Sequence, residues 1–133
     1  MLLRMISIPD TIEKICHNLL NDIAEVSQND NSIRFFRKDF TTMTIWLLII
    51  SSHLKGKKIN IEDIARAVAP SSKISKPSLR LILENAKHKG YIKFINSEND
   101  HRSWHVEPEE ITIKEFRSWI KKFLKENDKI KLD

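Results

Sequence analysis

Hydrophobic side chains recur at helical spacing in five stretches of the chain, and polar breaks separate these stretches. The helical stretches are residues 10–26, residues 41–54, the segment between Asn60 and Pro70, the segment between Ser75 and Gly90, and residues 112–125. Residues 91–95 are rich in β-formers, residues 96–101 are polar enough for a turn, and residues 102–106 return as a second strand. We therefore expect a mainly helical fold with one small β-hairpin.

The two helices before the hairpin have clear start and stop signals. Asn60 suits the cap of the first, because its side-chain oxygen can accept a hydrogen bond from an unpaired N–H group of the first turn. Pro70 ends that helix, since the residue before a proline is pushed out of the α region. Ser75 caps the second helix, with Pro77 near its first position, and Gly90 follows a basic last turn as its stop.

These elements follow one another in the order of a winged helix-turn-helix. A short strand at residues 58 and 59 precedes the two helices, and the hairpin after them forms the wing. The predicted fold class is mainly α with a small β-hairpin (α+β), with extra N- and C-terminal dimerisation helices. One domain, residues 1–133, then holds N-terminal and central helices at 10–54, the winged helix-turn-helix at 58–107 and a C-terminal dimerisation helix at 111–125.

The apolar run at residues 45–50 has no polar side, which predicts that this helix is central and forms the hub of the core. Phe35, Phe36 and Phe40 come just before it and are expected to plug the same core. The less favoured interpretation is an aromatic–basic surface that stacks the bases of single strands. Helix caps are predicted at Asp10 with Glu13, at Thr41 or Thr42, and at Thr112 with Glu115.

Composition bounds the class of protein. The chain has 133 residues, 41% of them hydrophobic and 31% charged, which is an ordinary globular balance. The single cysteine, Cys16, excludes an intramolecular disulfide, and its place in the apolar stripe of residues 10–26 favours a buried core side chain over a redox-sensing thiol. The first residues lack the features of a secretory signal, and residues 45–50 are far too short to span a membrane. We expect a soluble, cytoplasmic protein.

Positive charge is concentrated where the helix-turn-helix is predicted. Residues 55–93 contain ten lysines and arginines against three acids, a net charge of +7, whereas the whole chain carries +5 and the remainder about −2. This is the charge distribution expected of a surface that binds phosphates. The alternative is that these side chains merely solvate two helices. Because the helix order and the charge agree independently, we favour double-stranded DNA as the partner.

Two stretches resemble the MarR family of bacterial regulators. The run SKPSLRLILENAKHKGYI is similar to that family's recognition helix, followed by a basic residue, a glycine and the first wing strand. Asp100, His101, Arg102 and Ser103 match its wing pattern Asp-x-Arg-Ala/Ser/Thr, and the similarity covers most of residues 10–125. Three features depart from the family: no glycine follows the second wing strand, the final helix is short, and the turn at residues 70–74 is long.

The resemblance implies a dimeric winged-helix regulator. It further implies that Arg102 reaches the minor groove or is steadied by Asp100, and that a small-molecule effector binds between the dimer helices and the DNA-binding lobe. The alternative for Arg102 is a local salt bridge that only shapes the turn. The effector's chemistry is left open.

Our leading hypothesis is a sequence-specific transcriptional regulator that binds duplex DNA as a homodimer. Arg80 is the best candidate for a base contact, because its guanidinium can pair with guanine through two hydrogen bonds. The predicted DNA-binding residues are Lys73, Ser75, Lys76, Ser78, Arg80, Lys87, His101 and Arg102. The predicted dimer interface consists of Ile12, Ile15, Leu19, Ile23, Phe116, Ile120 and Phe123, from the first and last helices.

The alternative is a winged helix that makes protein–protein contacts in a larger assembly without binding DNA, which the mixed charge of the wing and the many apolar helices would suit. A structure-specific or RNA-binding role is a third hypothesis. No catalytic constellation is present: the five histidines are scattered, and no glycine-rich phosphate loop occurs. We expect no enzyme activity, no cofactor, no metal and no membrane partner.

Overall fold

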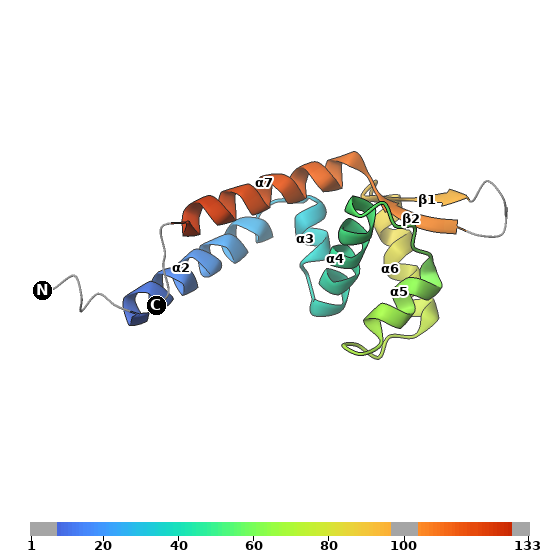
Figure 1. Ribbon diagram of the computed structural model, residues 1–133, viewed down its shortest axis with the longest axis horizontal. Helices are drawn as coiled ribbons and strands as arrows, with labels where there is room; N and C mark the ends of the chain where they lie inside the picture. The colour runs from blue at the N-terminus through green and yellow to red at the C-terminus, as the bar shows by residue number, and fades with distance from the viewer. Residues whose placement is uncertain (1–7, 97–103, 129–133) are drawn as a thin grey trace, which may run out of the picture. The chain divides into compact units, whose positions relative to one another are not determined.

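The computed structural model describes residues 8–96 and 104–128 (Figure 1). Its elements, in chain order, are α2 (Ile8–Ser27), α3 (Ser32–Phe36), α4 (Phe40–Leu54), α5 (Ile61–Val68), α6 (Lys76–His88), β1 (Ile92–Asn96), β2 (Trp104–Pro108) and α7 (Glu110–Asn127). These elements form two compact units, of which unit 2 spans Asn31–Glu115 and unit 1 combines the residues up to Asp30 with those from Phe116 onward. The predicted fold class, helices with one hairpin in winged helix-turn-helix order, is confirmed.

Helix α4 is the centre of unit 2, as its all-round apolar sequence predicts. It contacts α3, α5 and β2, and it contributes Ile45, Trp46 and Ile49 to the fully buried core. The ring of Phe36 stacks on Trp46, with centroids 5.9 Å apart and planes 4° apart. The expectation for Phe40 is wrong: it begins α4 and is 88% exposed, because the helical repeat places it opposite the buried face that holds Thr42, Ile45 and Ile49.

Local hydrogen bonds fix the helix-turn-helix at the predicted residues. Asn60 caps α5 through Oδ1, which accepts from the Asp63 N–H group at 2.8 Å, and the Asp63 carboxylate accepts from the Asn60 N–H group at 2.9 Å. Ser75 caps α6 by accepting from the Ser78 N–H group. Gly90 ends α6 with φ +80°, so that the Tyr91 N–H group can donate back to the Ala86 carbonyl.

The wing is a two-stranded antiparallel ribbon with one additional bridge. Ile92 lies opposite Pro108, and Asn96 lies opposite Trp104. The predicted short strand before α5 is present as a single bridge, in which the Val106 N–H group donates to the Ile59 carbonyl at 2.8 Å. This bridge ties the start of α5 to the wing within unit 2.

Three predicted caps are wrong. Helix α2 begins at Ile8, so Asp10 lies in its first turn; Asp39, and neither threonine, caps α4 by accepting from the Thr42 N–H group at 2.7 Å. Helix α7 begins at Glu110, which places Thr112 inside the helix, where its hydroxyl donates to the Tyr91 carbonyl at 2.7 Å. The predicted partner in that capping box, Glu115, instead accepts hydrogen bonds from the N–H and hydroxyl groups of Ser32.

In unit 1, α2 and the C-terminal part of α7 are joined by polar side chains. Asn18 donates to Asn127 at 3.0 Å, the Trp119 indole donates to Asp22 at 2.8 Å, and Lys122 donates to Glu25 at 2.6 Å. The hydrogen bond to Glu25 raises the pKa of the exposed Lys122 ammonium above its usual 10.5.

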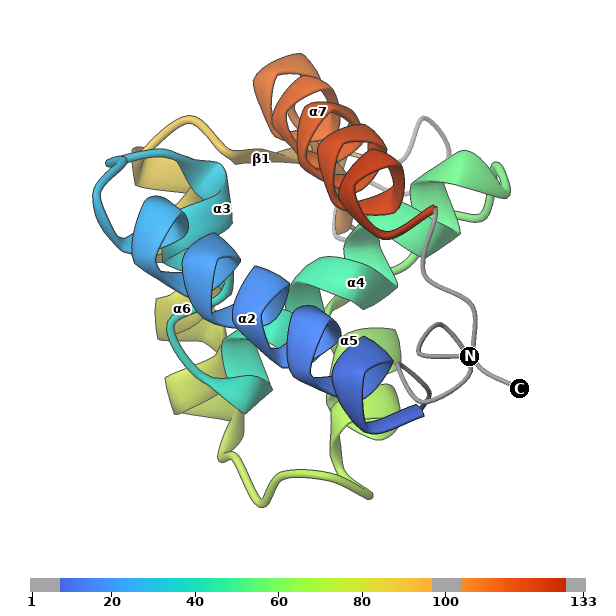
Figure 2. The same ribbon diagram turned by 90° about the vertical axis from the view of Figure 1, so that its left-hand side faces the viewer.

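Helix α2 continues without a break from Ile8 to Ser27 (Figure 2). The expectation of a buried Cys16 is wrong, because this side chain is exposed. It lies on the stripe of α2 that the polar contacts with α7 leave open.

Candidate nucleic-acid interface

Helix α6 has one buried face and one face open to a partner. Leu79, Leu83 and Ala86 are fully buried and Ile82 is half-buried, and together they form the core-facing stripe of the helix. Lys76, Arg80 and Lys87 are exposed on the other side of the helix, as predicted. Because the buried stripe fixes which side of α6 faces the core, its three cations lie together on the side that faces solvent.

The first turn of α6 is built around two serines predicted to contact DNA. The Ser75 hydroxyl donates to the Ser78 hydroxyl at 2.9 Å and also accepts from the Ser78 N–H group at 3.2 Å. Both side chains are exposed, as is Lys73 in the preceding turn. These hydroxyls therefore fix the start of the helix, and they lie where a phosphate could reach the N-terminal N–H groups.

Lys76 has a partner that the sequence did not reveal. Its ammonium lies 2.7 Å from a carboxylate oxygen of Glu62 in α5, and the two side chains are 62% and 56% exposed. This ion pair connects the two helices of the helix-turn-helix. A phosphate that binds Lys76 must therefore compete with, or share, the Glu62 carboxylate.

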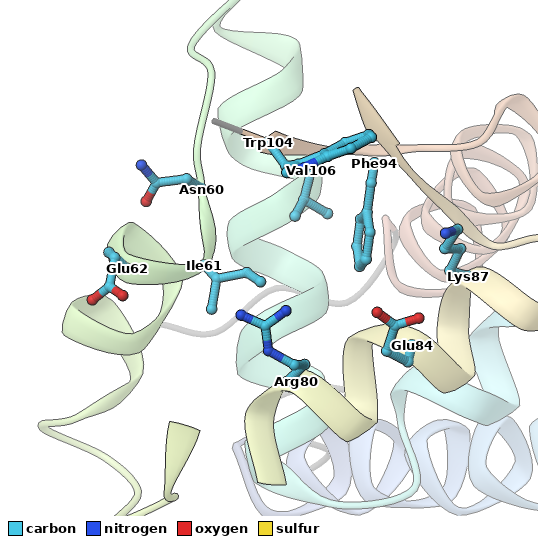
Figure 3. Close-up of a pocket in the computed structure, with 9 residues that line it drawn as sticks. All are labelled: Asn60, Ile61, Glu62, Arg80, Glu84, Lys87, Phe94, Trp104 and Val106. Atoms are coloured by element: carbon cyan, nitrogen blue, oxygen red, sulfur yellow. The ribbon is translucent and has the colours of Figure 1, made fainter. Parts of the chain in front are cut away.

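Arg80, Glu84 and Lys87 line a hollow of about 490 Å³ between α6, the start of α5 and the wing. Figure 3 shows Arg80 and Glu84 projecting from α6 into it, with the Phe94 ring of β1 pointing towards them. The Lys87 ammonium lies 5.1 Å from the centroid of that ring, a cation–π distance. Trp104 of β2 forms another wall and is 48% exposed.

Sequence reasoning missed the aromatic and apolar part of this surface. The sequence predicts Phe94 and Trp104 on the two wing strands but does not place them near α6. Alternate residues of a strand share one side, and the strand register sets Phe94 and Trp104 on the same side of the ribbon. Leu81 is 61% exposed on α6 even though its type suggests a core position. The predicted contacts His101 and Arg102 lie outside the described residues and stay predictions.

The residues predicted for the dimer interface include an open apolar stripe. Ile12, Leu19 and Ile23 of α2 are between 40% and 57% exposed. The remaining members are half-buried: Ile15, Phe116, Ile120 and Phe123. Two leucines that were not predicted, Leu20 and Leu124, extend the open apolar surface of unit 1.

None of the helices in residues 8–96 and 104–128 is long and apolar enough to cross a membrane. In the same residues no group of three histidine, cysteine, aspartate or glutamate side chains is arranged to hold a metal ion.

The sequence matches no family model, and it matches no curated protein. Among solved structures, two single-residue mutants of S. aureus MepR align with a TM-score of 0.55, at 17% and 18% identity, over 96% of this chain and 76% and 74% of theirs. The chain has the MarR-type winged-helix fold. The adhesin competence repressor AdcR of Streptococcus pyogenes aligns more weakly, with a TM-score of 0.42 and 16% identity over 86% of this chain and 81% of that chain.

The winged-helix fold gives α5 and α6 the positions of the first and second helices of a helix-turn-helix. In a helix-turn-helix the second helix enters the major groove with its first turns, and the first helix crosses the backbone. Helix α6 holds the position of that second helix, and the hollow lies between it, the start of α5 and the wing.

Proposed function

We propose that this chain is a transcriptional regulator that binds specific sequences in double-stranded DNA as a homodimer. The observation that carries the proposal is the exposed row of cations on the recognition helix. Lys76, Arg80 and Lys87 lie on one side of α6, inside a segment with a net charge of +7. A helix that enters the major groove with such a row meets phosphates on both sides of the groove and base edges at its floor.

The cations divide into two groups by their reach. Arg80 projects into the hollow near the middle of α6 and is the proposed base contact, because a guanidinium matches the O6 and N7 acceptors of guanine. Lys73, Lys76 and Lys87 are the proposed phosphate contacts, since a flexible ammonium binds as a point charge. Phosphate contacts position the protein and base contacts specify the sequence.

The test is the affinity for a labelled duplex as salt is varied. Three phosphate contacts in each of two subunits predict a slope of about −5 for log affinity against log salt. Lys73→Gln should reduce the magnitude of that slope by roughly 2, because the dimer loses two phosphate contacts. Lys114→Gln removes an exposed lysine from α7 outside the basic segment and is the matched control. Affinity that does not fall with salt would remove the phosphate-contact argument.

The homodimer is proposed from the apolar surface of unit 1. Polar side chains at positions 18, 22 and 25 join α2 to α7, and the stripe that carries Ile12, Leu19 and Ile23 stays exposed. An apolar stripe of this length is unusual on a monomer, and obligate dimer interfaces are typically apolar. A second copy that covers this stripe would also supply a second helix-turn-helix, which would bind a half-site about one turn of DNA away.

Sedimentation at micromolar concentration tests the dimer. The expected mass is twice 15.6 kDa. Replacing Ile120 and Phe123 with glutamate should give monomers that bind DNA far more weakly, because each half-site then binds alone. Lys121→Glu adds an acid at an exposed position of the same helix and should leave the dimer intact. A wild-type mass near 15.6 kDa would mean that the stripe is not a dimer interface.

A protein-interaction module is the second candidate, and the exposed Trp104 and Leu81 favour it. Trp104 lines the hollow together with Arg80, and Leu81 is exposed on α6. Chromatography separates the two functions: retention on a heparin column at moderate salt supports DNA binding. Stable co-purification with a protein, without retention on heparin, supports the interaction module.

A further inference from the structure

The basic segment at residues 55–93 contains three acids, and the structure gives partners to two of them. Glu62 is paired with Lys76 at 2.7 Å. Asp63 is paired with Arg66 at 2.6 Å and accepts the Asn60 N–H group in the capping box. Both acids therefore have a role within the helix-turn-helix itself.

Glu84 is the third acid, and its carboxylate makes no hydrogen bond or ion pair with any residue in 8–96 or 104–128. Two cations have the helical spacing that would allow an ion pair with Glu84, because Arg80 precedes it by four residues and Lys87 follows it by three. The Lys87 ammonium lies over the Phe94 ring instead. Arg80 extends towards α5 and the wing (Figure 3). Within the part of the chain that the structure describes, neither the Glu84 carboxylate nor the neighbouring Arg80 guanidinium of α6 has a hydrogen-bond or ion-pair partner.

A free carboxylate on this face opposes DNA binding unless it has a partner in the complex. The DNA phosphates repel the carboxylate, and its burial in the groove without a hydrogen-bond partner would add a free-energy cost of desolvation. The major groove offers one edge that fits a carboxylate well, the N4 amino group of cytosine, which only donates. Guanine presents two acceptors that repel the carboxylate, and thymine presents an acceptor and a methyl group.

We propose that Glu84 reads a cytosine by accepting a hydrogen bond from its N4 amino group, close to the guanine that Arg80 reads. The inference rests on the proposed DNA-binding function and adds a specificity-determining residue to it. Residues four apart are separated by about 6 Å along a helix axis, and base pairs by about 3.4 Å. The two side chains therefore address positions within about two base pairs of each other in one half-site.

The experiment is a selection from a library of duplexes with a random core, using the full chain as wild type and as two variants. Glu84→Gln should change the preferred base at one position from cytosine to adenine, because an amide pairs with adenine N6 and N7. Glu84→Ala should abolish the preference at that position and keep the others. Alanine and glutamine both favour helix at this exposed site, so the fold is retained, which circular dichroism checks.

A second measurement tests the hydrogen bond itself. The selected cytosine is replaced with 2-pyrimidinone, which lacks the 4-amino group. Wild type should lose about tenfold in affinity at each half-site, and Glu84→Ala should be insensitive to the replacement. Glu110→Gln makes the same charge change in the first turn of α7, outside the basic segment, and should behave as wild type.

The outcomes separate the two proposals. If wild type binds no duplex at low salt, the proposed function fails, and the assignment of Glu84 fails with it. If wild type selects a consensus that both Glu84 variants reproduce unchanged, DNA binding stands and only the assignment is overturned. A base preference that changes at the predicted position, together with insensitivity of Glu84→Ala to 2-pyrimidinone, supports it.

Discussion

Replacing Glu62 with glutamine should strengthen DNA binding while it slightly weakens the fold. Glu62 neutralises Lys76 at 2.7 Å, and Lys76 is a proposed phosphate contact. A phosphate oxygen that binds the other side of the ammonium would sit about 3 Å from the nitrogen. The phosphate and the Glu62 carboxylate would then be about 5.5 Å apart, two like charges that share one cation.

The size of the effect follows from that distance. Two unit charges about 5.5 Å apart in a water-like dielectric repel by roughly 0.75 kcal/mol. Two half-sites double this to about 1.5 kcal/mol, which corresponds to about tenfold in affinity. The loss of stability should be small, because both side chains are more than half exposed and such ion pairs contribute about 0–1 kcal/mol.

Fluorescence anisotropy with a labelled duplex measures the change at low salt, where screening is weakest. The gain should shrink as salt is added, since Glu62 and the phosphate are both near solvent. Glu110→Gln is the matched control, because it removes an exposed acid from α7 at the same change in net charge. Equal affinity of Glu62→Gln and wild type at low salt would refute the reasoning, as would an equal gain in the Glu110 variant.

Three further predictions concern stability and protonation. Asn60→Ala removes the side-chain acceptor of the α5 capping box, keeps the backbone N–H bond to Asp63, and should destabilise the chain by about 1 kcal/mol in urea unfolding. Phe36→Ala removes a fully buried ring that stacks on Trp46 and should lower the free energy of unfolding by about 3–5 kcal/mol in the same assay. Because Glu25 raises the pKa of Lys122, their contact stabilises unit 1 below pH 10.5 and is lost as pH rises through the raised pKa; Glu25→Gln should lower that pKa in an NMR titration.

The helix boundaries that the sequence predicted correctly depend on hydrogen bonds between near neighbours. Asn60 and Ser75 each accept from an N–H group three residues on, and Gly90 is needed for a positive φ. These interactions are complete within a few residues, so the local sequence determines them. The wing could be predicted for a similar reason, since its two paired strands are close together in the sequence.

Some of the incorrect predictions involve a choice that tertiary packing makes, whereas the cap of α4 is decided locally by Asp39. Thr112 and Glu115 have the spacing of a capping box, but Glu115 binds Ser32, 83 residues away in the chain. Phe40 is apolar, but the helical repeat places it on the side of α4 opposite the buried Ile45 and Ile49. The partner of Lys76, 14 residues away, could not be read from helical spacing, because Glu62 lies on α5 and Lys76 on α6.

Glu62 and Glu84, the two exposed acids that line the hollow, should have different effects on sequence specificity. Glu62 is proposed to lie beside a phosphate contact, so its removal should strengthen binding to every sequence by the same factor. Glu84 is proposed to meet a base, so its removal should strengthen binding to random duplexes and weaken the preference for the selected site. A regulator is limited by its ratio of specific to non-specific affinity, since competing sites vastly outnumber the operator. On that measure Glu62→Gln leaves the ratio unchanged and Glu84→Ala lowers it, although both variants gain one positive unit of net charge per chain.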